Sequence, residues 1–133
     1  MLEFFMAMNP PTATAQEKKF NRETGKVYLK SEAKAARGIL MAHLAEFRPK
    51  DPIIGPVEVE IMWLYKNSEK KDGTWHTAKP DLDNIEKDLL DCMVKMGFFP
   101  DDKFISRKIT EKRWTTNIPG IYIKVRRLKE GQR

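Results

Sequence analysis

Apolar and polar residues alternate along several segments of the chain, which we predict to be β-strands. The clearest alternation covers residues 56–65, where four apolar side chains fall on one face: Val57, Val59, Ile61 and Trp63. Residues 2–8, 103–115 and 120–128 have weaker strand patterns. A small hairpin with its turn at Glu23-Thr24-Gly25 is compatible with the polar residues that follow the first strand.

Two further segments have the spacing of amphipathic helices. Residues 32–47 follow Ser31, a suitable N-cap, and residues 84–96 precede Gly97, a suitable C-terminal cap. The resulting order is strand, helix, strand, helix, strand, strand. It predicts an α+β fold, with two main helices packed on a mixed sheet in a single small domain over residues 1–133. We expect residues 129–133 to form a flexible tail.

The amino-acid composition restricts the class of protein to which the chain can belong. The hydrophobic content of 41% is sufficient for a small core. The predicted core residues are Phe4, Ala36, Leu40, Leu44, Val57, Val59, Ile61, Ile85, Leu89, Met93, Ile105, Ile109, Ile121, Ile123 and Val125. No apolar run approaches the roughly 18–20 residues of a membrane span, so we expect no membrane partner. The lone Cys92 cannot form an internal disulfide, which favours a reducing cytoplasm.

The charge pattern indicates a polyanionic partner. The chain has 25 basic and 19 acidic residues, a net charge of +6. A polar loop over residues 66–80 contains Trp75 among basic residues, which suits contact with a nucleic acid, although a mobile solvated loop would have the same composition. The candidate DNA contacts in this loop are Lys66, Lys70, Lys71, His76 and Lys79.

Asp81 and Asp83 form a possible metal site just before the second predicted helix. In an extended backbone, side chains at i and i+2 point to one side, about 6–7 Å apart. Carboxylates with open coordination positions suit Mg²⁺, which can activate water for phosphodiester cleavage. Lys87 lies one turn further on and could stabilise charge on the phosphate. Whether Asp101-Asp102, beyond a helix about 20 Å long, shares this site depends on the fold or on a second subunit.

Each of these residues also has a purely structural interpretation. Asp83 and Glu86 have the spacing of a capping box. Asp101-Asp102 is typical of a turn, and Lys87 could pair with Asp91 four residues later. An isolated D-x-D is therefore a weak signal without further context.

A longer motif supplies that context. The run Lys79-Pro80-Asp81-Leu82-Asp83-Asn84-Ile85-Glu86-Lys87-Asp88-Leu89-Leu90-Asp91, followed by Gly97 and Asp101-Asp102, resembles the RusA family of Holliday junction resolvases. The resemblance implies a homodimeric, Mg²⁺-dependent endonuclease that cuts four-way junction DNA symmetrically. By position it implies that Asp81, Asp83 and Asp102 are the essential aspartates and metal ligands, and that Lys87 is the essential lysine. Asn84 would orient a carboxylate or contact the DNA backbone.

We therefore expect a structure-selective DNA endonuclease that acts in recombination and repair, of a kind often encoded by phages and prophages. The alternative is a non-catalytic nucleic-acid-binding module, which shares the basic charge. That alternative does not explain the aspartates, because carboxylates beside DNA are unfavourable unless a cation lies between them.

Overall fold

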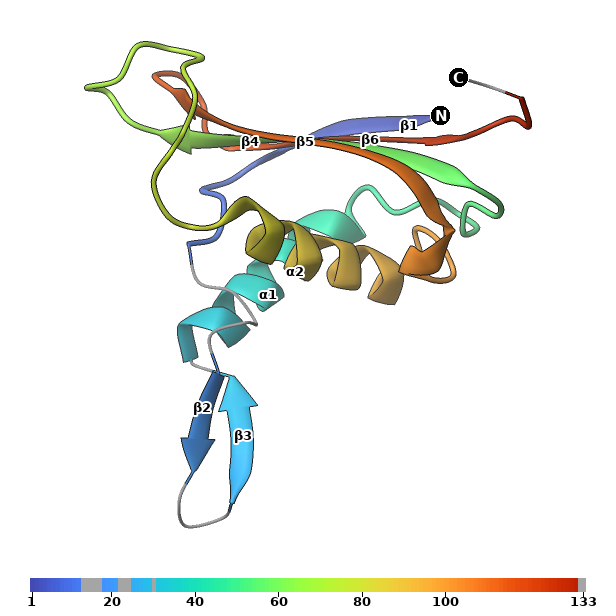
Figure 1. Ribbon diagram of the computed structural model, residues 1–133, viewed down its shortest axis with the longest axis horizontal. Helices are drawn as coiled ribbons and strands as arrows, with labels where there is room; N and C mark the ends of the chain where they lie inside the picture. The colour runs from blue at the N-terminus through green and yellow to red at the C-terminus, as the bar shows by residue number, and fades with distance from the viewer. Residues whose placement is uncertain (13–17, 22–24, 30, 132–133) are drawn as a thin grey trace.

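The computed structural model of the chain describes residues 1–12, 18–21, 25–29 and 31–131. Its body is a four-stranded sheet with helices against one face, while the other face is open (Figure 1). The strands are β1 (Leu2–Ala7), β4 (Val57–Lys66), β5 (Ile105–Thr115) and β6 (Gly120–Arg127). The helices are α1 (Ser31–Ala45) and α2 (Leu82–Lys95), and a 3₁₀ turn η1 (Asp102–Phe104) precedes β5. The predicted α+β class and element order are confirmed.

The predicted hairpin is also present, as β2 (Lys18–Asn21) paired with β3 (Lys26–Leu29). It projects away from the sheet and the helices (Figure 1). Gly25 has a φ of 69°, as the end of such a turn requires. Glu23 and Thr24 of the predicted turn lie outside the described residues.

The sheet is mixed and has the strand order β1-β6-β4-β5. β4 pairs with β5 in parallel and with β6 antiparallel, and β1 pairs antiparallel with β6. A parallel pair needs a crossover connection, and α2 provides it between β4 and β5. The short link from β5 to β6 must pass the end of β4, where Lys66 Nζ donates to the carbonyls of Thr116 at 2.7 Å and Asn117 at 2.9 Å.

The core lies between the sheet and the two helices. Most of the predicted core is buried, including Phe4, Leu40, Leu44, Val57, Val59, Ile61, Ile85, Leu89, Met93, Ile121, Ile123 and Val125. Ala36 and Ile105 are only partly buried. The prediction for Ile109 is wrong: its side chain is 43% exposed. On β5 the neighbouring Lys108 reaches the helix side, so the alternation of the strand turns Ile109 to the open face.

Phe98 and Phe99, in the loop after α2, are completely buried. The reason is the chain reversal after α2. Gly97 has a φ of 83°, and the amide of Phe98 donates to the carbonyl of Met93 at 3.0 Å. The predicted cap at Gly97 is therefore confirmed, and it directs the two aromatic rings under the sheet.

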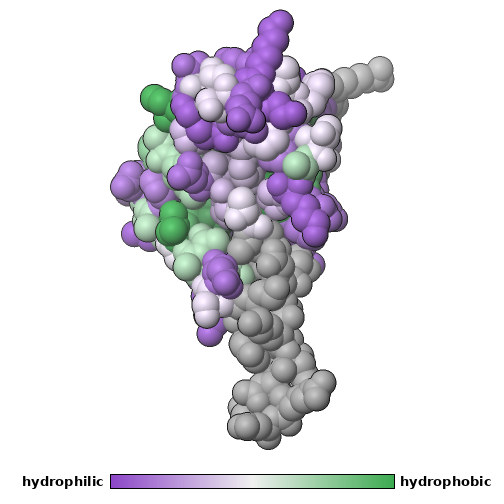
Figure 2. All heavy atoms as spheres, turned by 90° about the vertical axis from the view of Figure 1, so that its left-hand side faces the viewer, coloured by the Kyte–Doolittle hydropathy of each residue, from purple (hydrophilic) through white to green (hydrophobic). Residues whose placement is uncertain are grey.

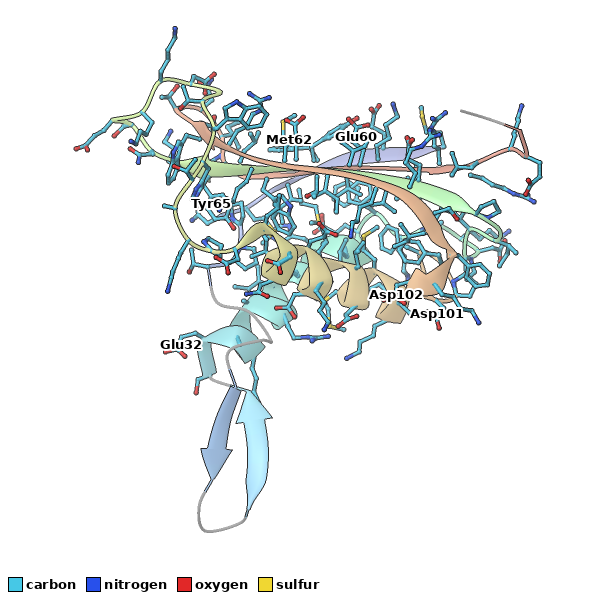
Figure 3. All side chains as sticks on the ribbon, in the orientation of Figure 1. Glu32, Glu60, Met62, Tyr65, Asp101 and Asp102 are labelled. Atoms are coloured by element: carbon cyan, nitrogen blue, oxygen red, sulfur yellow. The ribbon has the colours of Figure 1, made fainter. Side chains whose placement is uncertain are left out.

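The open face of the sheet is polar, with apolar residues among the charges. Glu60 and Met62 project from it, whereas Tyr65 points toward the helices (Figure 3). Glu58 accepts hydrogen bonds from Arg126 at 2.8 Å and Arg107 at 2.9 Å. These bonds, Arg126 first, lower the pKa of Glu58 from 4.5 to about 2.

Cys92 is buried in the core as a free thiol. In the part of the chain that the structure describes, no helix has the length and the apolar character needed to cross a membrane.

Candidate active site along helix α2

The first turn of α2 places the two central aspartates differently from an extended D-x-D. Asp81 is the N-cap, with φ −68° and ψ 136°, and the helix begins at Leu82 rather than at the predicted residue 84. Asp83 therefore lies inside the first turn, where its charge is favourable to the helix dipole. The capping-box interpretation of Asp83 is wrong because Asp81 occupies the cap. The Asp81 carboxylate makes no capping hydrogen bond.

An exposed hollow with a volume of about 420 Å³ lies along the side of helix α2. Asp83, Asn84 and Lys87 line it from the helix, and Asp102 lines it from η1. The structure thus brings together, around one hollow, four of the residues that the motif singles out. Asp83 and Lys87 both lie on the solvent side, one helical turn apart, while the apolar side of the helix faces the core.

Asp102 reaches the hollow because the chain turns back after α2. Asp101 caps η1 by accepting a hydrogen bond from the backbone N–H of Lys103 at 3.0 Å. Asp101 and Asp102 lie together at the far end of α2 (Figure 3). The pKa of Asp102 is raised, first by its hydrogen bond with Asp101, then by burial and by the charges of Asp101 and Asp91. Negative charge is therefore concentrated where a cation would stabilise it.

Glu86 and Lys108 also line the hollow, and the sequence interpretation missed both as site residues. Glu86 is buried and forms an ion pair with Lys108 across the gap between α2 and β5. On β5, Lys108 has the same parity as Trp114, which packs against the core, whereas the sequence pattern suggests that Ile105 and Ile109 face inward. A charged residue in that register points toward the helices and needs a partner there.

Asp81 lies at a second hollow, of about 570 Å³, between the end of the long loop and β5. Lys112 shapes this region by donating to the carbonyls of Ala78 and Pro80, both at 2.5 Å. Burial lowers the pKa of Lys112, and the negative charge of Asp81 opposes that shift. Lys112 too was missed, although it also has the helix-facing register of β5.

The residues predicted to contact DNA from the loop separate into two groups. Lys70, Lys71 and Lys79 are exposed, and Asn84 is half-buried at the first hollow. His76 is only 5% exposed, and burial, followed by the charge of Lys112, lowers its pKa to about 4. A neutral buried imidazole does not fit the predicted phosphate contact. Lys66 is exposed but already holds the carbonyls of the β5–β6 link.

The carboxylates suit Mg²⁺ in chemistry but not as one complete cluster. Among the described residues, no group of three or more His, Cys, Asp or Glu side chains is gathered closely enough to hold a metal ion. Mg²⁺ usually keeps several waters and needs only one or two protein carboxylates. Asp83 and Asp102 line the same hollow from the two ends of α2, while Asp81 faces the other hollow.

A family model and a curated relative match most of the chain. The family model described as endodeoxyribonuclease RusA matches residues 9–126, which include both hollows. A curated relative from Lactococcus phage r1t, named crossover junction endodeoxyribonuclease rusA, is 27% identical over 118 residues. That match covers 84% of this chain and 90% of the relative.

Proposed function

Because the chain belongs to the RusA family of endodeoxyribonucleases, we propose that it resolves four-way DNA junctions by Mg²⁺-dependent, symmetric phosphodiester cleavage. Its enzyme class is that of a crossover junction endodeoxyribonuclease, as the family and the phage relative indicate. Its biological role is in DNA recombination and repair in the cytoplasm, in a phage or prophage setting like that of the relative.

The observation that carries the proposal is the hollow shared by Asp83, Lys87 and Asp102. These residues come from the start of α2, the next turn and a separate 3₁₀ turn. On a protein with net charge +6, acidic residues at the DNA-binding surface would repel the phosphates of the DNA. A metal ion between carboxylate and phosphate removes this repulsion.

Each residue has a defined part in the reaction. Asp83 and Asp102 would hold the metal, with Asp81 completing the acidic surface at the N-cap. A metal held there would lower the pKa of a bound water and would place positive charge near the scissile phosphate. Lys87 neutralises charge that develops on the phosphate oxygens. Glu86 and Lys108 are positioning residues, since their ion pair ties this turn of α2 to β5.

The active form in this proposal is a homodimer. A four-way junction presents two equivalent strands, and symmetric cutting needs two sites related by a twofold axis. A second subunit is also one source for a further carboxylate, given that the described residues of one chain do not gather three. Light scattering at micromolar concentration tests the dimer, and a fully active monomer contradicts it.

The remaining DNA contacts come from exposed basic side chains near the site. Lys70, Lys71 and Lys79 belong to the loop before α2, and Asn84 lines the first hollow. Lysines act on phosphates without reading sequence, so they supply affinity and orientation.

The test is incubation with a labelled four-way junction, a fork and a linear duplex, with Mg²⁺ and with EDTA. The proposal predicts paired nicks in the junction that need Mg²⁺ and are absent in EDTA. Tight junction binding without nicking under any divalent metal would instead identify a non-catalytic binding module.

A further inference from the structure

The second hollow, at Asp81, has a lining that phosphodiester chemistry alone does not require. Its volume of about 570 Å³ lies within the range of pockets that hold small organic groups. Trp75 and Lys79 line it from the loop, and Thr110, Glu111 and Lys112 line it from β5. The Glu111 carboxylate is paired with Arg113 at 2.9 Å. An aromatic ring, two ammonium groups and a hydroxyl therefore lie around one space beside a proposed catalytic carboxylate.

The loop that carries Trp75 is firmly attached to β5. The amide of Trp114 donates to the carbonyl of Thr74 at 2.9 Å, and the amide of His76 donates to the carbonyl of Lys112 at 3.0 Å. Trp75 itself forms an antiparallel bridge with Arg113. The loop thus continues the sheet beyond β5, and Trp75 is held in place before any ligand arrives.

The Trp75 ring is supported but not covered. The guanidinium carbon of Arg113 lies 3.6 Å from the ring centroid, which fixes the orientation of the indole. Trp75 is nevertheless 60% exposed, whereas Trp63 is completely buried. Arg113 does not line the hollow, so the ring is supported by it and still reaches the open space. The end of the molecule that carries this loop is otherwise mostly hydrophilic (Figure 2).

Nucleic-acid bases are the groups that fit this combination. A fixed aromatic ring offers a stacking surface, nearby cations attract the phosphates, and the Thr110 hydroxyl can donate to or accept from a base edge. Stacking requires a base that has left its own helix. The strands of a four-way junction change direction at the crossover, where a base can leave the stack at lower cost than within a duplex.

We infer that the hollow lined by Trp75, Lys79 and Lys112 receives one unstacked DNA base next to the phosphate that is cut. The inference rests on the proposed nuclease function. Asp81 joins the two hollows, because it lines this one and directly precedes the helix turn that carries Asp83. A base stacked on Trp75 would place its own phosphate at the start of α2. Trp75 is then the residue that holds and positions the nucleotide at the cut.

Photo-crosslinking tests the contact without relying on cleavage. Junctions carry 5-iododeoxyuridine at one crossover position at a time and are irradiated with the protein in EDTA. We expect a cross-link at Trp75, located by mass spectrometry, from one position beside the cut. Trp75→Phe keeps it and Trp75→Ala loses it. Ile118→Ala is a matched control, since Ile118 is also an exposed apolar residue, 65% exposed, on another loop.

Binding affinities give the quantitative test. Loss of a stacked base typically weakens binding by roughly 5- to 150-fold. Trp75→Ala should therefore bind the intact junction that much more weakly, and an abasic site at the cross-linked position should weaken wild-type binding similarly. The two changes together should cost no more than either alone, because they remove one contact.

The outcomes separate the two proposals. Junction cutting by the wild type, with no cross-link at Trp75 and fully additive losses, overturns the base site and leaves the nuclease function intact. A wild type that neither binds nor cuts junctions overturns both.

Discussion

The imidazole of His76 stacks face to face on the indole of Trp114, with ring centroids 3.7 Å apart and an interplanar angle of 11°. His76 also packs edge-on against Tyr65 at 4.8 Å. The histidine thus belongs to an aromatic cluster that attaches the long loop to β4 and β5. Its position explains why a residue that the sequence suggests as a DNA contact is instead a structural one.

The pKa of His76 is about 4 in the folded chain, against an ordinary value of 6.5, so the unfolded chain protonates this ring more readily. The contribution of the neutral ring to the free energy of unfolding is therefore fully present above pH 6.5 and is lost as the pH falls toward 4. We predict that the melting temperature decreases over this range and that His76→Phe shows a smaller decrease. Thermal melts at pH 7, 5.5 and 4.5 measure it. Identical pH profiles for the two proteins would contradict the assignment.

The Glu86–Lys108 ion pair predicts a stability effect on α2. Lys108→Met leaves a buried carboxylate without its partner, and we expect a loss of about 1–3 kcal/mol in the free energy of unfolding. Urea denaturation measures the change, with Lys71→Met, an exposed loop variant, as the control. Adding Glu86→Gln to Lys108→Met should recover part of the loss, because the unpaired charge is then absent. No recovery would argue against the ion pair.

Lys87 should act on the reaction more than on binding. It is exposed on α2, so Lys87→Ala should fold normally and bind junctions within a few-fold of the wild type. The single-turnover cutting rate should fall by about 10²–10³, the usual effect of losing a group that stabilises transition-state charge. Lys95→Ala is the matched control, exposed on the same helix but outside the hollow. Equal losses of affinity and rate would reduce Lys87 to a binding residue.

Much of the fold follows from local patterns in the chain. The alternation over residues 56–65 and the helical spacing before Gly97 predict β4 and α2, because each buries one face against the same core. The motif around Lys79–Asp91 predicts that Asp83 and Lys87 lie together, and both line the first hollow. The prediction succeeds because residues one helical turn apart share a face of the helix.

Other features depend on contacts that are distant in sequence. Ile109 has the pattern of a core residue, but the register of β5 beside β4 turns it outward and turns Lys108 inward. The burial of His76 depends on Trp114, far along the chain. The position of Asp102 depends on how η1 turns back toward α2. None of these pairings leaves a periodic signal in one segment.

The Asp83→Asn variant tests the central claim most directly. Asparagine keeps the shape of the side chain, and loss of the first-turn charge should cost at most about 1 kcal/mol of stability. Single-turnover cleavage of a four-way junction in Mg²⁺ is compared for wild type and variant, after thermal melts confirm that both are folded. If Asp83 holds the metal, we predict a fall in rate of at least about 100-fold with junction binding in EDTA retained. Cleavage at the wild-type rate by the folded variant would contradict the account.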